Sequence, residues 1–261
     1  MSAISRIVMV AAALYVPHES NGKVKLMWLQ SVVLKRQMAA LICLVALCVS
    51  PQSHADSDDV DLALVLAVDC SFSVDEREFR LQMQGLAAAF QKADVKAAIA
   101  NGALQRIAVS VVEWSDSSSH ATVVPWTVIA SSGDADGFSE KLRVAKRSIG
   151  QGGTSISSAL LYSANLMDEA PRSLRHVIDV SSDGRNNLGV PVSGVRDHLV
   201  AKGITINALV IRNEWPTLDV YFKNFVVGGV DHFVIPADDY EAYADAIRRK
   251  LVREITGPGI S

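Results

Sequence analysis

The sequence predicts an α/β fold, a doubly wound and mostly parallel sheet with helices on both faces. Apolar runs typical of buried strands alternate with segments whose apolar residues recur at helical spacing. Residues 62–68 are apolar without interruption and are bounded by acids, which is typical of a strand covered on both faces. No repeat or linker interrupts the alternation after residue 56, so we expect one domain over residues 56–261.

Six apolar runs have the length of strands. In chain order they are residues 62–68, 107–114, 121–128, 177–181, 204–211 and 232–235. The polar residues 115–120 are long enough to form a hairpin between the second and third strands. Helical segments separate most of the others, which is the arrangement that parallel strands with crossover helices require.

Five amphipathic helices are expected, each indicated by apolar residues that recur every three or four positions along one face. These sets are Phe79, Met83, Leu86 and Phe90; Phe138, Leu142, Ala145 and Ile149; Ile156, Leu160, Ala164 and Met167; Val192, Val195 and Leu199; and Tyr240, Tyr243, Ile247 and Leu251. Gly203 follows the fourth set and is placed to end that helix, since glycine readily adopts the left-handed backbone found at helix C-termini.

The N-terminal part of the chain, residues 1–55, is interpreted as a secretory signal region. Lys35 and Arg36 precede an apolar run at residues 38–49. That run is too short to span a bilayer but suits the core of a signal peptide. A buried core helix is the alternative, but the very polar stretch that begins at Asp56 disfavours it.

The end of this region has the small residues of a cleavage site. Ser53 and Ala55 occupy the two positions where such residues are needed, so we expect cleavage after Ala55. Met27 is a plausible true start of translation. We therefore expect a secreted or periplasmic protein that has no stable membrane span once the signal is removed.

Charge and cysteine content exclude several classes of protein. Five basic residues and one acid before residue 56 leave a net charge of −7 on the remainder of a chain whose formal charge is −3. That acidic remainder gives no reason to expect a nucleic-acid partner. Cys70 is the one cysteine after residue 55, so no internal disulfide and no CxxC motif is available. We expect Cys70 to be buried in the core.

Three loops expected at one edge of the sheet carry hydroxyl and carboxylate side chains. Asp69, Ser71 and Ser73 follow the first strand, Thr154 precedes the third helix, and Asp183 follows the fourth strand. In an extended turn, residues i, i+2 and i+4 point to one side, so the first three side chains can converge. Ligands of such sheets bind at the carboxyl ends of the strands. A set of oxygen donors suits a hard divalent cation, Mg²⁺ or Mn²⁺.

Each loop also has a purely structural interpretation. Ser73 with Glu76 matches a capping box at the start of the first helix. Thr154 or Ser155 could be the N-cap of the third helix. Asp183 with the glycine that follows is an ordinary turn pair. The ordered combination of the three loops, each at the expected edge, favours a functional site, and the capping roles do not exclude a metal.

The three segments resemble the metal-ion-dependent adhesion site of von Willebrand factor type A domains. That site is written D-x-S-x-S, then a threonine in a glycine-rich loop, then an aspartate after a later strand, and it matches residues 69–73, 152–155 and 182–185. The resemblance covers about residues 61–255, looks closest to secreted bacterial members with no assigned biochemical role, and implies a Rossmann-like fold. Cys70 and the strand ending Glu113-Trp114-Ser115 depart from the family pattern.

The resemblance implies that Ser71, Ser73 and Thr154 bind the cation through their hydroxyls, while Asp69 and Asp183 act directly or through water. Because neutral hydroxyls donate weakly, the ion would stay electrophilic and keep a position open for a partner's carboxylate. We therefore expect an extracytoplasmic binding or adhesion module, not an enzyme, whose partner is a protein with an exposed Asp or Glu.

An enzyme is the alternative, a Mg²⁺-dependent hydrolase or phosphoryl-transfer enzyme that uses the same oxygen donors. The sequence has no G-x-S-x-G elbow, no G-x-x-x-x-G-K-[ST] phosphate loop and no G-x-G-x-x-G after the first strand. Its histidines after residue 55 stand in no recognisable relation to Ser71, which as a nucleophile would need a base.

Overall fold

The computed structural model describes residues 59–257, which form a six-stranded sheet in the order β3-β2-β1-β4-β5-β6. All neighbouring strands are parallel except β2 and β3, which are antiparallel. The strands are β1 (Leu62–Asp69), β2 (Ile107–Trp114), β3 (His120–Ile129), β4 (His176–Ser182), β5 (Ile204–Ile211) and β6 (Val234–Ala237). The predicted doubly wound sheet is confirmed.

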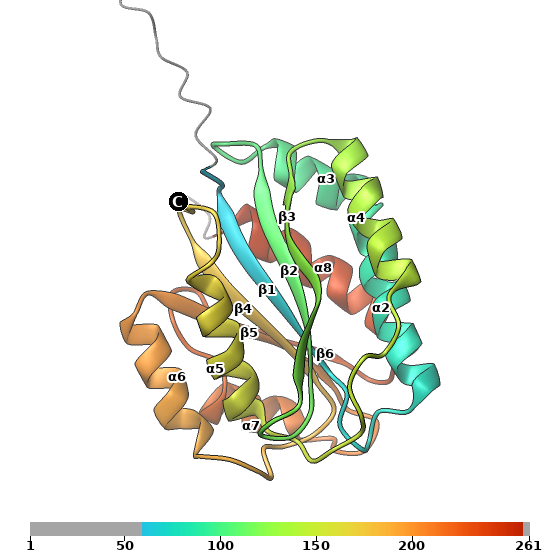
Figure 1. Cartoon of the computed structure of the whole chain (residues 1–261), viewed down its shortest axis with the longest axis vertical. Coiled ribbons are helices and arrows are strands. Elements are labelled where there is room, and N and C mark those ends of the chain that lie inside the picture. Colours follow the sequence, from blue (N-terminus) through green and yellow to red (C-terminus); the bar gives the residue numbers. More distant parts are fainter. Residues whose placement is uncertain (1–58, 258–261) are drawn as a thin grey trace, which may run out of the picture. The chain divides into compact units, whose positions relative to one another are not determined.

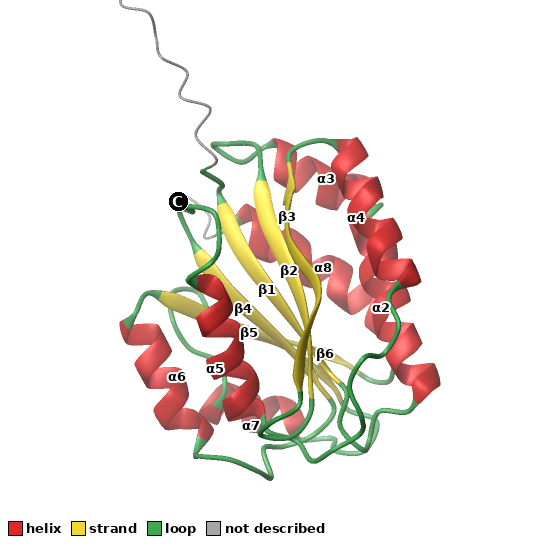
Figure 2. Cartoon of the chain, in the orientation of Figure 1, coloured by secondary structure: helices red, strands yellow, loops and turns green. Residues whose placement is uncertain are grey.

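Helices cover both faces of the sheet (Figures 1 and 2). One face is covered by α2 (Glu76–Phe90), α3 (Ala93–Ala100), α4 (Ser132–Val144) and α8 (Tyr243–Thr256). The other face is covered by α5 (Ile156–Met167), α6 (Val192–Ala201) and α7 (Leu218–Phe225). The molecule therefore has two hydrophobic cores with the sheet between them.

The first strand contributes to both cores. Side chains of a strand alternate between the two faces of a sheet. Leu62 and Leu64 accordingly pack into the core under α2 and α8, while Ala63 and Val65 pack into the core under α5 and α6. Every residue of β1 is buried, as its uninterrupted apolar run predicts.

The strand order reverses between β1 and β4. The chain runs outward from β1 to β2 and β3, and outward on the other side from β4 to β5 and β6. Since β1 and β4 are parallel neighbours, the loops that follow them emerge at the same edge of the sheet. Such a switch point is where open α/β sheets bind their ligands.

Some element boundaries differ from the sequence interpretation. The helix expected to include Ala145 and Ile149 ends at Val144, because Ala145 has an extended backbone with ψ of 132°. Ile149 packs against the core from a loop instead, so the apolar spacing continues where the helix does not. The last strand, β6, lies two residues later than residues 232–235, and Tyr240 precedes the closing helix.

The short helices α3 and α7 are not predicted by the apolar spacing. Each has eight residues, and each buries one pair of side chains four positions apart, Val95 with Ile99 and Leu218 with Phe222. A single pair does not establish a period, so these helices are defined by packing against the rest of the fold.

The closing helix α8 is held to the sheet by a buried ion-pair cluster. The Lys250 Nζ lies 2.8 Å from the Asp179 Oδ1 of β4 and also contacts the Glu254 carboxylate. Asn207 of β5 donates its Nδ2–H to the Glu254 Oε1 at 3.0 Å. Burial and the nearby charge of Glu254 raise the pKa of Asp179 to about 7, although Lys250 opposes the shift.

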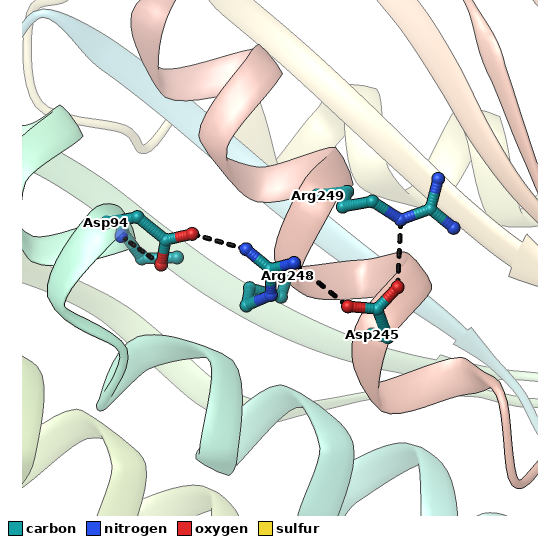
Figure 3. A network of polar contacts seen from close by, with 5 residues as sticks. Asp94, Asp245, Arg248 and Arg249 are labelled. Carbon is teal, nitrogen blue, oxygen red and sulfur yellow. Dashed lines mark hydrogen bonds and ion pairs between the residues drawn. The ribbon is translucent and has the colours of Figure 1, made fainter.

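At the surface, α8 is joined to α3 by a second and exposed set of ion pairs (Figure 3). Arg248 contacts Asp94 of α3 and Asp245 of its own helix, and Arg249 lies 3.0 Å from Asp245. Exposed pairs of this kind contribute little to stability, so the buried cluster around Lys250 is the stronger constraint on α8.

No helix within residues 59–257 is both long enough and apolar enough to cross a bilayer. The predicted signal region, residues 1–55, lies outside the described residues.

We expect Lys250→Met to lower the free energy of unfolding by about 3 kcal/mol, because it leaves two buried carboxyls without their cation. Loss of the ammonium should raise the pKa of Asp179 further above its value in the unfolded chain. The protonated group is then favoured by the fold, so the loss of stability should be larger at pH 8 than at pH 5. Urea unfolding of wild type and variant at both pH values measures this.

The exposed Lys223→Met is the matched control, since Lys223 pairs with Asp219 on the surface of α7. It should change stability by less than about 1 kcal/mol at either pH. Equal destabilisation by Lys250→Met at pH 5 and pH 8 would contradict the electrostatic explanation.

Candidate functional site

The loops after β1 and β4 and the loop before α5 meet at the carboxyl edge of the sheet. The Phe72 backbone N–H donates to the Gly152 carbonyl at 2.9 Å, which joins the first loop to the loop before α5. A Cβ atom built on Gly184 would lie 3.3 Å from the Thr154 Oγ1, which places that hydroxyl beside the loop after β4. The fold thus brings together the three segments that the sequence singles out.

Asp69, the last residue of β1, is fully buried and accepts two hydrogen bonds at its carboxylate. The Ser71 backbone N–H donates to Oδ1 at 2.7 Å, and the Ser182 hydroxyl donates to Oδ2 at 2.5 Å. Gln82 of α2 donates its Nε2–H to the Asp69 backbone carbonyl at 3.2 Å. The Asp69 side chain is therefore fixed in one orientation at the end of the strand.

Asp183 is held by donors from two distant parts of the chain. The Ser73 hydroxyl donates to Oδ1 at 2.6 Å, and the Tyr240 hydroxyl donates to Oδ2 at 3.0 Å. The Ser71 and Ser73 hydroxyl oxygens lie 3.2 Å apart. A continuous chain of contacts therefore runs from Asp69 through the two serines to Asp183.

Thr154 is nearly buried and is positioned through its backbone. Its N–H donates to the Asn187 Oδ1 at 2.8 Å, and its carbonyl accepts from the N–H groups of Asn187 and Leu188. Its hydroxyl makes no hydrogen bond with any other residue of the described chain. That oxygen is therefore available as a donor atom beside Gly184.

The two carboxylates share one electrostatic environment. Burial and the negative charge of Asp183 raise the pKa of Asp69 to about 7. Burial also raises the pKa of Asp183, against the hydrogen bonds from Ser73 and Tyr240 that lower it. The charged forms of both acids are therefore disfavoured. A positive charge bound next to them would stabilise those charged forms.

Of the capping interpretations of these hydroxyls, only the one that puts Ser155 at the N-cap position of α5 is confirmed. The N-cap of α2 is Asp75, which forms a capping box with Glu78, so Ser73 with Glu76 is not the capping box. Ser155 occupies the N-cap position of α5 but makes no side-chain capping bond, and Thr154 is not the cap. The hydroxyls of Ser73 and Thr154 are thus not used to begin helices.

Two residues that contact the acids are missed by the sequence interpretation. Ser182 lies in the segment 182–185 but is given no role at the site, and Tyr240 is assigned to the apolar face of a helix. Ser182 could have been found, because it is a polar residue at the end of a strand, at the edge where ligands of such sheets bind. No local signal identifies Tyr240, which is 57 residues from Asp183 in sequence.

The loop between α4 and α5 is fastened to the first loop by Arg147. Its guanidinium donates to the Val74 carbonyl at 2.9 Å and to the Cys70 carbonyl, which lie on either side of the Ser71–Ser73 turn. On the other side, the buried Glu113 Oε2 accepts from the Ser148 N–H at 2.8 Å and from its hydroxyl at 2.7 Å. Glu113, near the end of β2, departs from the family pattern and anchors this loop.

Cys70 is fully buried in the core beneath the first loop, as expected. Burial, and the negative charges of Glu113 and Asp69, raise the pKa of its thiol. A thiol that is both buried and protonated reacts slowly, which agrees with a packing role.

The donor atoms offered at this edge are carboxylate and hydroxyl oxygens. Hard divalent cations prefer such ligands, whereas zinc in structural sites takes mostly cysteine and histidine. No group of three or more His, Cys, Asp or Glu that could hold a metal occurs within residues 59–257. A cation bound here would depend on hydroxyls as well as on the two acids.

Comparisons with known proteins identify relatives by family and by fold. A family model described as "Protein of unknown function (DUF1194)" matches residues 59–259. No curated protein matches the sequence.

Three solved structures are similar at low sequence identity. Proximal thread matrix protein 1 from the mussel byssus is 15% identical with a TM-score of 0.57 over 76% of this chain and 49% of its own; one of its structures has a zinc-occupied MIDAS motif. A von Willebrand factor type A protein from Catenulispora acidiphila is 16% identical with a TM-score of 0.53, over 75% of this chain and 43% of its own. The pilus adhesin SpaC from Lactobacillus rhamnosus GG is 14% identical with a TM-score of 0.51, over 75% of this chain and 30% of its own.

This chain thus spans about half the length of the mussel protein and less of the other two. Identities this low establish a shared fold.

We expect Arg147→Ala to lower the free energy of unfolding by about 2 kcal/mol, because the Cys70 and Val74 carbonyls lose a charged donor. Amide exchange at residues 71–74 should accelerate, since the turn would be fastened by fewer contacts. Urea unfolding and hydrogen exchange measure the two effects. Arg143→Ala is the matched control, because Arg143 makes only an exposed pair with Glu140. Unchanged exchange at residues 71–74 in Arg147→Ala would show that Arg147 does not fix the turn.

Proposed function

The chain belongs to the DUF1194 family and has the von Willebrand factor type A fold, and from this premise we propose that it is an extracytoplasmic, metal-dependent binding module. In the proposed site, Ser71, Ser73 and Thr154 contribute hydroxyl oxygens, and Asp69 and Asp183 contribute carboxylates directly or through water. The partner is a protein that offers an acidic side chain to the bound cation.

The observation that carries the proposal is a pair of buried acids without a cation of their own. Asp69 is fully buried and the Asp183 side chain is close to it, yet neither forms an ion pair with any Lys, Arg or His of residues 59–257. A buried charge without a partner is strongly unfavourable. A divalent cation would neutralise both acids, and three hydroxyls stand beside them to complete its ligands.

The hydroxyls explain why such a site suits binding. When bound, the cation supplies an electrophilic centre, because neutral hydroxyls reduce its charge less than carboxylates would. The chain's own residues do the rest: Ser182 and the Ser71 N–H orient Asp69, and Tyr240 orients Asp183. A carboxylate from a partner can then complete the shell of ligands.

The relatives support this proposal by what is recorded of them. The mussel protein has been seen with zinc in its MIDAS motif, and SpaC is a pilus adhesin. The oxygen donors of this chain favour Mg²⁺ or Mn²⁺ over zinc as the resident ion. Secretion of the module to the cell exterior or periplasm rests on the signal region predicted at residues 1–55.

The geometry supports the alternative of an enzyme less well than it supports a binding module. No histidine of the described chain makes a hydrogen bond with Ser71 or Ser73, so neither hydroxyl is paired with a histidine base. The Asp183 carboxylate accepts from Ser73 and from Tyr240, and in the proposed site its charge serves to bind the cation.

Added Mg²⁺ should raise the melting temperature of the wild-type protein, because a ligand of the folded state stabilises it by about 2.7 kcal/mol at 100 times its Kd. Asp183→Asn should shift far less, since it removes a charge from the proposed site while keeping the side-chain shape. Asp238→Asn, an exposed aspartate outside the site, is the matched control and should shift like wild type. Equal shifts for wild type and Asp183→Asn in a thermal titration with Mg²⁺, Mn²⁺ and Ca²⁺ would place the metal elsewhere.

Mg²⁺ affinity should fall as the pH falls below 7. The pKa of Asp69 in the metal-free protein is about 7, so at lower pH a proton must leave before the cation binds. Between pH 8 and pH 6 the Kd should rise about tenfold for one such proton. Titration calorimetry in two buffers of different ionisation enthalpy measures the affinity and the proton released together. Thr154→Ala should weaken binding at both pH values without changing their ratio; a Kd independent of pH in the wild type would refute the role of Asp69.

A further inference from the structure

A large aromatic side chain stands in solvent in the middle of the first loop. Phe72 is 72% exposed although it lies between Ser71 and Ser73, and its backbone N–H is fixed by the Gly152 carbonyl at 2.9 Å. An exposed phenylalanine on a fixed backbone gains nothing from the fold itself. Apolar side chains held out in this way, when they occur together, mark interaction surfaces.

Other exposed apolar side chains emerge from loops at the same edge. Leu188 is 42% exposed and reaches over Gly153, where an added Cβ would lie 2.3 Å from the leucine Cδ1. Val190 lies two residues further along the same loop, and Trp215 in the loop after β5 is 48% exposed. We call Phe72, Leu188, Val190 and Trp215 the apolar rim.

One cation without an acidic partner in the described chain lies against Trp215 of the apolar rim. The Arg185 guanidinium lies 5.3 Å from the Trp215 ring centroid and 5.5 Å from that of Tyr221, and it donates to the Thr217 hydroxyl at 3.3 Å. It forms no ion pair with any acid of residues 59–257. Tryptophan, tyrosine and arginine are the residues most enriched among those that dominate binding energy at protein interfaces. Arg185 follows Asp183 by two positions in the loop after β4, so its positive charge is offered at the same edge of the sheet as the proposed site.

Two glutamates near the site and the rim limit how much negative charge a partner can bring. Glu78 of α2 lies near Asp183 and also near Glu214, the neighbour of Trp215, and burial together with the charges of Asp75, Asp183 and Glu214 raises the pKa of Glu78. A partner rich in acids would be repelled by these groups, whereas the charge of one acid would be offset by the cation and by Arg185.

We propose that the apolar rim and Arg185 select a protein segment in which a single acidic side chain is flanked by apolar side chains. The inference rests on the proposed function, because the acid of that segment is the group offered to the bound cation. It adds the sequence context of the partner's acid: apolar neighbours pack on Phe72 and Leu188, and further acids are excluded by Glu78 and Glu214.

Three capped, fluorescent peptides with one central aspartate test the proposal. Their flanking residues are glycines, or leucine and phenylalanine, or glutamates, and binding to the full chain in Mg²⁺ is followed by fluorescence anisotropy. The apolar-flanked peptide should bind about tenfold more tightly than the glycine-flanked one, and the glutamate-flanked one more weakly than either. In Phe72→Ser and Leu188→Ser the ratio of the first two affinities should fall towards one.

Leu174→Ser is the matched control, because Leu174 is 66% exposed in the loop that precedes β4, at the opposite edge of the sheet, and should keep the wild-type ratio. A ratio near one in the wild type, or a ratio unchanged in Phe72→Ser and Leu188→Ser, overturns the proposal. If Mg²⁺ raises the melting temperature and no peptide binds, the metal site stands and this inference fails. If peptide binding is unaffected by EDTA, the proposed function itself fails.

A membrane is the other occupant that an apolar rim could suit, and phosphatidylglycerol vesicles test it. The protein should not sediment with these vesicles in Mg²⁺. Sedimentation that is lost in Phe72→Ser would show that the rim inserts into lipid and would overturn the proposal of a protein segment.

Discussion

Two carboxylates, Asp69 and Asp183, are buried together where β1 and β4 end, and the organisation of this edge of the sheet follows from that constraint. The strands are parallel neighbours at the switch point, so their terminal acids cannot avoid each other. Each acid is surrounded by groups that donate hydrogen bonds to it, namely the Ser71 N–H and the hydroxyls of Ser73, Ser182 and Tyr240. These neutral donors reduce the cost of burial without removing the charge.

Strand β4 also carries a buried acid, Asp179, for which the protein itself supplies the cation. Asp179 lies four residues before Asp183 in the chain, and with Glu254 it forms a second buried acid pair. There Lys250 is placed between the acids and closes the cluster. The pair at the carboxyl edge has hydroxyls where the other has an ammonium. Because of this contrast, the cluster around Lys250 holds α8 in place, whereas we propose an external cation for the other.

The loops at the edge are fixed to one another before any ligand arrives. Arg147 holds the turn between Cys70 and Val74, and Glu113 holds the loop that leads to Thr154. Donor atoms that are already in place lose little entropy on binding, which is how a set of weak hydroxyl ligands becomes useful. The exposed residues of the apolar rim project from these same fixed loops, so they present a defined surface.

The sequence by itself determined the sheet, its two layers of helices and the edge at which the proposed site lies. Uninterrupted apolar runs and helical spacing are local properties, and the order of the elements limits the topology to few choices. The first loop was also recognisable, since its aspartate and two serines alternate in the chain as they do around the site. The same alternation predicts that Cys70 points away from the serines and into the core, where it lies.

Only the tertiary structure decided which polar residues surround the acids and which begin helices. Tyr240, expected on a helix face, donates to Asp183 because the chain turns back over the edge before α8 begins. Asp75, not Ser73, caps α2, because the helix begins only at Glu76. Apolar spacing ran past the end of α4 because Ile149 packs from a loop that Glu113 and Arg147 hold. Each of these outcomes depends on contacts between residues far apart in the chain, and local spacing contains no information about them.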